Sequence, residues 1–202
     1  MLRVGLTGGI ACGKSLVADF FRDAGIPVVN DDDAARDAVA IGTPGLAAVV
    51  EAFGPQVLGP DGTLDRPALG RIVFADPEQR LRLMNATFPF IGRLVLERIQ
   101  AAEETGAPML VYESALLVEN RQAENWRPLV VVWAPPEIQI SRLRARNQLS
   151  EEDARNRIAS QMAVEEKRAL ADHAIDNSGT PGQTRACFDS VLEELYRKAR
   201  SQ

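Results

Sequence analysis

Apolar residues gather in short continuous runs that are separated by stretches with helical periodicity. Such a run indicates a strand that is buried on both faces, as the strands of a parallel sheet are. The runs fall at residues 2–6, 28–29, 109–113, 129–133 and 174–176. Because helical patterns separate them, the sequence predicts an α/β fold with a five-stranded parallel sheet, whose ligands bind at the carboxyl ends of the strands.

The stretch between the second and third runs has a different character. Residues 41–104 contain no clear buried strand, and their periodicity predicts a series of helices. These helices are expected at 44–53, from about 66 to 74, at 77–86 and at 91–104, with a turn at 59–62. We interpret the stretch as a helical insertion between sheet strands, and such insertions often bind the second substrate of an enzyme.

Further helices are expected around the last two runs, at 136–146 and at 183–199. Between them a helix is predicted to begin at Ser150, which with Asp153 resembles a capping box. This single helix is expected to carry several polar and cationic side chains: Arg155, Arg157, Gln161, Lys167 and Arg168.

Composition and charge exclude several classes of protein. Of the 202 residues, 46% are hydrophobic and 25% are charged, as in an ordinary globular protein. The net charge of −5 argues against a general nucleic-acid binder, which usually has a basic excess. No apolar run approaches the ~20 residues that cross a bilayer, the chain begins with a strand rather than a signal peptide, and Cys12 and Cys187 provide no disulfide framework. We therefore expect a cytoplasmic protein without a membrane or nucleic-acid partner.

Residues 8–15 fit the phosphate-loop pattern G-x-x-x-x-G-K-[ST], and they lie between the first strand and an amphipathic helix. Glycines let the backbone approach phosphate oxygens closely, and the N–H groups of the loop and helix offer positive dipoles to an anion. In this pattern Lys14 reaches the β- and γ-phosphates and the Ser15 hydroxyl binds Mg²⁺. The sequence therefore predicts nucleotide phosphate binding. We interpret Cys12 as a small filler of the loop, with a redox-sensitive thiol as the alternative.

Phosphoryl transfer to an alcohol also needs a group that orients the acceptor, a metal, and cations for the developing charge. The aspartates at 31–33 follow the second strand, and Asp32 or Asp33 could accept a hydroxyl proton, or simply cap a helix in a solvated turn. The arginines of residues 139–168 could supply the cations, or form a solvated face with ion pairs. Glu113 lies at the end of a strand, where many phosphate-loop enzymes place a carboxylate that assists Mg²⁺. Alternatively, Tyr112 and Glu113 are simply a polar pair at the end of the strand.

Further motifs follow the phosphate loop along nearly the whole chain. They are the aspartate-rich run ending in Ala35-Arg36, then Leu64-Asp65-Arg66, Val73-Phe74, Leu116-Leu117-Val118-Glu119, Gln139-x-x-Arg142-Leu143-x-x-Arg146, Arg157-Ile158-x-x-Gln161, Lys167, Ala171-Asp172 and Ile175-Asp176-Asn177-x-Gly179. In this order the series resembles the dephospho-coenzyme A kinases. The phosphate loop is common to many families, but the remaining motifs together are specific.

The resemblance implies an ATP- and Mg²⁺-dependent enzyme that phosphorylates the ribose 3′-hydroxyl of dephospho-coenzyme A, the last step of coenzyme A synthesis. It implies a phosphate-loop kinase core of three α/β/α layers over 1–32, 106–136 and 169–202, a helical coenzyme A domain over 33–105, and a lid over 137–168. The implied catalytic residues are Asp32 as the candidate base, Lys14 and Arg142. Contacts to ATP are implied for Gly8, Gly9, Ala11, Cys12, Gly13, Lys14, Ser15, Leu16, Arg142, Asn177 and Gly179, with Ser15 at the metal. Contacts to the acceptor are implied for Asp32, Arg36, Leu117, Glu119, Arg157 and Gln161.

Departures from the family pattern bear on details. Asn30 replaces the first aspartate of an Asp-x-Asp pair and leaves Asp32 in place. Phe88 stands where a histidine usually precedes proline, and Ala115 stands where a proline usually precedes the two leucines. The phosphate loop has Ala11-Cys12 and Leu16 where glycine, serine and threonine are more frequent. Because Lys14 and Ser15 are present, we expect the activity to survive.

Two other functions are possible for a chain with a phosphate loop. A different small-molecule kinase with the same core, such as a nucleoside monophosphate kinase, would share the phosphate loop, but the motifs at 31–36, 116–119 and 177–179 disfavour it. A GTPase-like switch would need a guanine-reading Asn-Lys-x-Asp element, which does not occur in the chain.

Overall fold

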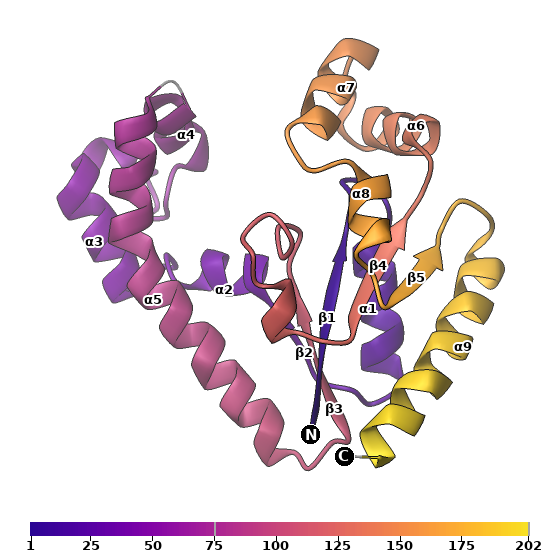
Figure 1. Ribbon diagram of the computed structural model, residues 1–202. Helices are drawn as coiled ribbons and strands as arrows, with labels where there is room; N and C mark the ends of the chain where they lie inside the picture. Colours follow the sequence, from indigo (N-terminus) through magenta and orange to yellow (C-terminus); the bar gives the residue numbers. More distant parts are fainter. Residues whose placement is uncertain (75, 202) are drawn as a thin grey trace. The chain divides into compact units, whose positions relative to one another are not determined.

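The computed structural model describes residues 1–74 and 76–201, and it has the predicted α/β architecture (Figure 1). The strands are β1 (Leu2–Gly8), β2 (Val28–Asn30), β3 (Met109–Glu113), β4 (Leu129–Trp133) and β5 (His173–Asp176). They form one sheet in the order β2-β3-β1-β4-β5, in which β1 pairs in parallel with β3 and β4, and β4 with β5. The prediction of a five-stranded parallel sheet is confirmed.

The register of the sheet aligns the carboxyl ends of its central strands. Leu6 of β1 is opposite Glu113, the last residue of β3, and Gly8 at the end of β1 is opposite Val132 of β4. Every residue of β3 is buried, as are the first four residues of β4. Burial on both faces explains why these strands are continuous apolar runs in the sequence.

The chain divides into two compact units, residues 1–29 with 101–202, and residues 30–100. In the first unit, α1 (Lys14–Asp23) and α9 (Pro181–Arg200) pack against the sheet and against each other. The ring of Phe188 meets that of Phe21 edge-on, with 4.8 Å between centroids. Figure 1 shows α1 behind the strands and α8 (Val164–Ala169) in front of them, and α8 contacts β4.

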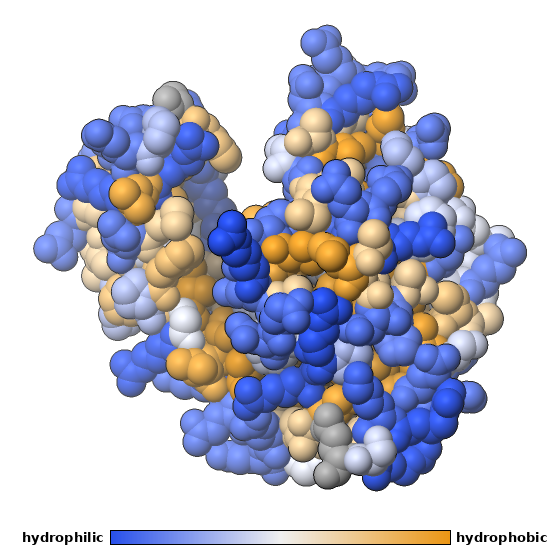
Figure 2. Space-filling view, viewed as in Figure 1, coloured by the Kyte–Doolittle hydropathy of each residue, from blue (hydrophilic) through white to orange (hydrophobic). Residues whose placement is uncertain are grey.

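Between β4 and β5 the first unit carries α6 (Pro136–Asn147), α7 (Glu151–Ala159) and α8. The single helix predicted from Ser150 is wrong, because the chain leaves the helical path after α7. The N–H of Met162 donates to Glu119 Oε1 at 3.2 Å instead of to a carbonyl of the preceding turn. Ser150 does accept the Asp153 N–H as predicted, at 3.0 Å. Figure 2 shows hydrophilic side chains over much of the outer surface of α6 and α7.

The second unit is helical, with α2 (Asp31–Asp37), α3 (Pro44–Phe53), η1 (Pro55–Val57), α4 (Arg66–Phe74) and α5, which extends from Pro77 to Glu104. Its core consists of Val39, Val49, Phe53, Val57, Leu69 and Val73. The prediction of two helices at 77–86 and 91–104 is wrong, since α5 continues through Pro89. Proline removes one backbone hydrogen bond of a helix, and α5 continues without this bond. Within the preceding turn, the Thr87 hydroxyl donates to Leu83 O at 2.8 Å. Within the described residues, no helix combines the length and apolar character needed to cross a membrane.

Candidate functional site

The phosphate loop, residues 9–13, connects the end of β1 to the start of α1. Gly13 has φ of 88°, and a Cβ there would lie 2.0 Å from the side chain of Asn177. A Cβ on Gly8 would lie 2.5 Å from the Val132 carbonyl oxygen. Both positions therefore require glycine, one for its backbone angle and its neighbour and the other for close packing of strands.

The side chain of Asn177 holds the loop from the far side of β4. Its Nδ2 donates to Cys12 O at 2.7 Å, and its Oδ1 accepts from the Thr184 hydroxyl at 2.7 Å. Asn177 is only 5% exposed, so both bonds are shielded from water. The predicted ATP contact of Asn177 thus coincides with a residue whose amide already braces the phosphate loop, while Gly179, two residues on, is exposed.

The unusual interior of the loop packs in two directions. Cys12 is fully buried in the apolar core that surrounds the sheet, whereas Ile10 and Ala11 pack against the small cluster of Ile140, Leu143 and Ala154 in α6 and α7. Burial raises the pKa of the Cys12 thiol to about 11. This environment suits the filler interpretation of Cys12, because a protonated, inaccessible thiol is a poor nucleophile.

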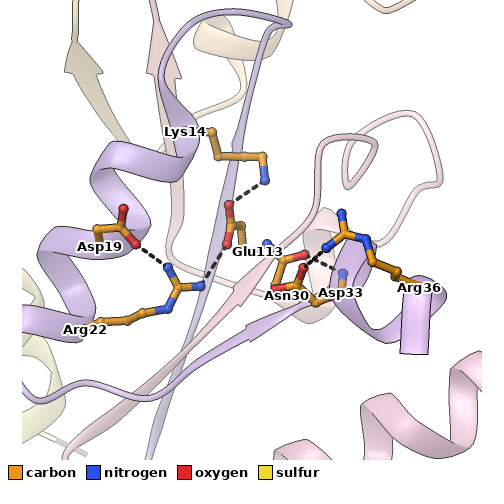
Figure 3. A network of polar contacts seen from close by, with 7 residues as sticks. All are labelled: Lys14, Asp19, Arg22, Asn30, Asp33, Arg36 and Glu113. Atoms are coloured by element: carbon orange, nitrogen blue, oxygen red, sulfur yellow. Dashed lines mark hydrogen bonds and ion pairs between the residues drawn. The ribbon is translucent and has the colours of Figure 1, made fainter. Parts of the chain in front are cut away.

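Lys14, the first residue of α1, and Glu113, the last residue of β3, form a buried ion pair. Lys14 Nζ lies 2.7 Å from Glu113 Oε1, and the Glu113 side chain is 1% exposed. Arg22 of α1 approaches the other carboxylate oxygen at 3.4 Å and also pairs with Asp19 at 2.7 Å (Figure 3). Two cations therefore balance Glu113, so Lys14 can turn toward a phosphate without leaving a buried carboxylate uncompensated.

A Mg²⁺ ion fits the donors at this end of the sheet. Ser15 presents an exposed hydroxyl in the first turn of α1, and Glu113 places a carboxylate beside Lys14. Magnesium is usually held by one or two such groups together with substrate phosphates, rather than by a cage of protein ligands. The described residues contain no cluster of three or more His, Cys, Asp or Glu side chains that could hold a metal.

The helices between β4 and β5 contribute Arg142 to the same unit. Its Nη2 donates to the backbone oxygen of Asn177 at 2.8 Å. Its Nη1 is buried and has no hydrogen-bond partner among the described residues. A buried guanidinium nitrogen without an acceptor is costly, and a bound phosphate oxygen would satisfy it.

Other predicted acceptor contacts in this unit differ in accessibility. Arg157 is exposed, whereas Gln161 accepts the Ile10 N–H of the phosphate loop at 3.1 Å. Glu119 accepts from Met162, and its second oxygen is buried without a partner in the described part of the chain. Leu117 is fully buried, its backbone included.

The acidic run opens α2 in the second unit. Asn30 is the N-cap, and its Oδ1 accepts the Asp33 N–H at 3.0 Å, which explains why an amide serves where the family pattern has aspartate. The carboxylate of Asp33 is paired with Arg36 at 3.0 Å (Figure 3). The side chain of Asp32 is exposed and makes no hydrogen bond or ion pair within the described residues.

Sequence reasoning missed three residues of this arrangement: Arg22, Lys167 and Thr184. Arg22 and Thr184 occupy ordinary helical positions, and no local pattern distinguishes them. Lys167 belongs to the series of motifs in the sequence, but its neighbours in the sequence do not reveal that its side chain is completely buried.

Comparisons with known proteins show which family the chain resembles. The sequence model of the family described as dephospho-CoA kinase matches residues 2–182. A dephospho-CoA kinase of Thermobifida fusca is 44% identical over 202 residues, which is all of both chains. One of Arabidopsis thaliana is 44% identical over 194 residues, 96% of this chain and 84% of that protein.

Solved structures with a similar fold are found over nearly the whole chain. A Thermus thermophilus protein is 34% identical with a TM-score of 0.82, and the match covers 96% of this chain and 97% of the other. A dephospho-CoA kinase from Campylobacter jejuni is 28% identical with a TM-score of 0.66, over 95% and 96% of the two chains.

Proposed function

The chain belongs to the dephospho-CoA kinase family, and from this premise we infer that it transfers the γ-phosphate of ATP to the ribose 3′-hydroxyl of dephospho-CoA. The product is coenzyme A, so the reaction is the last step of its synthesis. The phosphate loop is the observation that carries the assignment of roles. Lys14 of this loop lies beside Glu113. Arg142 donates to the backbone of Asn177, whose side chain contacts the loop, and Arg142 has a second, buried nitrogen without a partner among the described residues.

The first unit binds ATP. The backbone N–H groups of Gly13 and of the start of α1 hold the phosphates, and Lys14 donates to the β- and γ-phosphate oxygens. Arg142 supplies positive charge to the transferring group from the opposite side, as an arginine on a lid does. Ser15, together with the phosphates, would hold Mg²⁺, which would supply positive charge to balance the charge that develops during transfer. Residues 137–168 act as the lid in this proposal.

The second unit binds dephospho-CoA. It contains a groove of about 310 Å³ between the start of α3 and the middle of α5, lined by Pro44, Phe90 and Leu94 and by charged side chains that include Asp37 and Arg93. An apolar groove with polar neighbours suits the pantetheine arm, which alternates methylene groups with amides. Residues 33–105 thus form the acceptor domain of the proposal.

Asp32 is the proposed general base. Its carboxylate has no intramolecular partner among the described residues, whereas that of Asp33 is engaged by Arg36. A free carboxylate at a helix start can accept the proton of the attacking hydroxyl and orient that hydroxyl toward phosphorus.

The test measures phosphate transfer from ATP to dephospho-CoA in the presence of Mg²⁺. We expect Asp32→Asn to lower kcat by about 10²-fold or more, with little change in ATP binding. Asp33→Asn is the matched control and is expected to retain most of the activity. Near-normal turnover of Asp32→Asn would exclude it as the base. Wild-type protein that phosphorylates nucleoside monophosphates but leaves dephospho-CoA unchanged would overturn the function itself.

A further inference from the structure

Lys167 is a buried cation that the proposed mechanism does not use. Its side chain is 0% exposed, on helix α8. The chain has 23 Lys and Arg residues, of which three are lysines, at positions 14, 167 and 198. An ammonium group out of contact with water is strongly unfavourable unless several acceptors surround it, so the contacts of this lysine indicate what it holds in place.

The ammonium of Lys167 connects α8 to the segment that follows β3. Nζ lies 2.7 Å from Glu119 Oε1 and donates to Ala115 O at 2.8 Å. The same Ala115 oxygen accepts from the Thr7 hydroxyl of β1 at 3.2 Å. One point charge therefore fixes both ends of the segment 115–119, directly after the strand that carries Glu113.

The segment in turn fixes the connection between α7 and α8. Glu119 Oε1 accepts the Met162 N–H at 3.2 Å as well as pairing with Lys167. The preceding residue, Gln161, accepts the Ile10 N–H of the phosphate loop at 3.1 Å. A continuous series of polar contacts thus leads from the buried ammonium, through Glu119 and the backbone of residues 161–162, to the phosphate loop.

We propose that Lys167 is a positioning residue of the phosphate-transfer site, which holds Gln161 against Ile10 and thereby sets the shape of the phosphate loop. The proposal rests on the proposed function of that loop in ATP binding. Without the ammonium, the Glu119 carboxylate and the Ala115 carbonyl lose a charged donor, and the segment 115–119 no longer holds the backbone of residues 161–162.

A lysine suits this position for geometric reasons. Its compact ammonium directs three N–H groups to acceptors in different directions, whereas the planar guanidinium of arginine matches two oxygens in one plane. The acceptors here are a carboxylate oxygen of Glu119 and the backbone oxygen of Ala115, two separate residues of one segment, at 2.7 and 2.8 Å. This accounts for a lysine in a chain whose other cations are nearly all arginine.

The test compares Lys167→Met with Lys198→Met, the same substitution at an exposed lysine of α9. For Lys167→Met we expect the KM for ATP to rise about tenfold or more, because the phosphate loop loses the contact that holds Gln161 against Ile10. We also expect faster hydrogen exchange of the Ile10 amide, measured by NMR without substrates. Lys198→Met should change none of these quantities.

The proposal fails if folded Lys167→Met matches Lys198→Met in the KM for ATP and in Ile10 exchange, whatever its thermal stability. If Lys167→Met does not fold, Gln161→Leu removes the last contact of the series directly. It is then expected to raise the KM for ATP and the exchange rate of Ile10, and unchanged values would overturn the proposal. Wild-type protein without dephospho-CoA kinase activity would refute the proposed function instead, and the exchange measurement would still decide the positioning role.

Discussion

Replacing Asn177 by alanine distinguishes two roles of its side chain, supporting the phosphate loop and contacting the nucleotide. The substitution leaves Cys12 O without its donor, in a site where Asn177 is 5% exposed. A buried polar group that loses its partner costs about 1–3 kcal/mol, and the small cavity adds to this. The Thr184 hydroxyl keeps a second acceptor, Thr180 O at 3.3 Å, so its loss is smaller. We expect Asn177→Ala to lower the free energy of unfolding by about 2–4 kcal/mol in the absence of nucleotide.

Urea unfolding followed by tryptophan fluorescence measures this quantity for the relevant unit, because Trp126 and Trp133 both belong to the unit that carries the loop. Asn156→Ala, at an exposed position of α7, is the matched control and should stay within about 0.5 kcal/mol of the wild type. If Asn177→Ala changes the free energy of unfolding by less than about 0.5 kcal/mol, the Asn177 side chain does not support the phosphate loop. If ATP affinity fell while stability did not, the side chain would instead be a ligand contact.

Two further predictions concern titratable groups. Burial alone would raise the pKa of Asp172, but hydrogen bonds from the Leu129 N–H and the Arg127 guanidinium outweigh it and lower the pKa below 3.8. The carboxylate therefore stabilises the fold above pH 3.8, and this effect is lost as the pH falls through the lower pKa of Asp172 in the folded protein. Urea titrations should show that the free energy of unfolding falls less on acidification in Asp172→Asn than in the wild type. The Cys12 thiol is buried and its pKa is raised to about 11, so it should resist a thiol reagent in the native protein while half-buried Cys187 reacts. Mass spectrometry of labelled peptides measures both reactions, and labelling of Cys12 before Cys187 would contradict the prediction.

The elements that the sequence predicted well are those whose environment is the same along their whole length. The strands at 109–113 and 129–133 agree with β3 and β4 residue for residue, because both are buried on both faces. The helix at 44–53 also agrees, since Thr43 accepts the Leu46 N–H as N-cap and Pro44 follows it. The phosphate loop was recognised because its spacing follows from backbone geometry.

The failures occur where distant contacts decide the local structure. Residues 160–163 have a composition that allows helix, but Glu119 takes the Met162 N–H and ends the helical path. Pro89 argues for a helix boundary, yet α5 continues through it. The partners of Asn177 and Lys167 are separated from them by 165 and 52 residues. No periodicity in a local window contains such information, and a resemblance identifies a residue without giving its contact.

The phosphate loop packs against two clusters of different size, and this bears on how the protein loses structure on heating. Cys12 packs in the sheet core, but Ile10 and Ala11 pack against the apolar cluster of α6 and α7, which has three buried members among the described residues. A cluster of that size opens at lower free energy than the core. We therefore expect local opening of α6 and α7 to expose one side of the loop while the sheet stays folded, so that activity is lost on heating before the sheet unfolds.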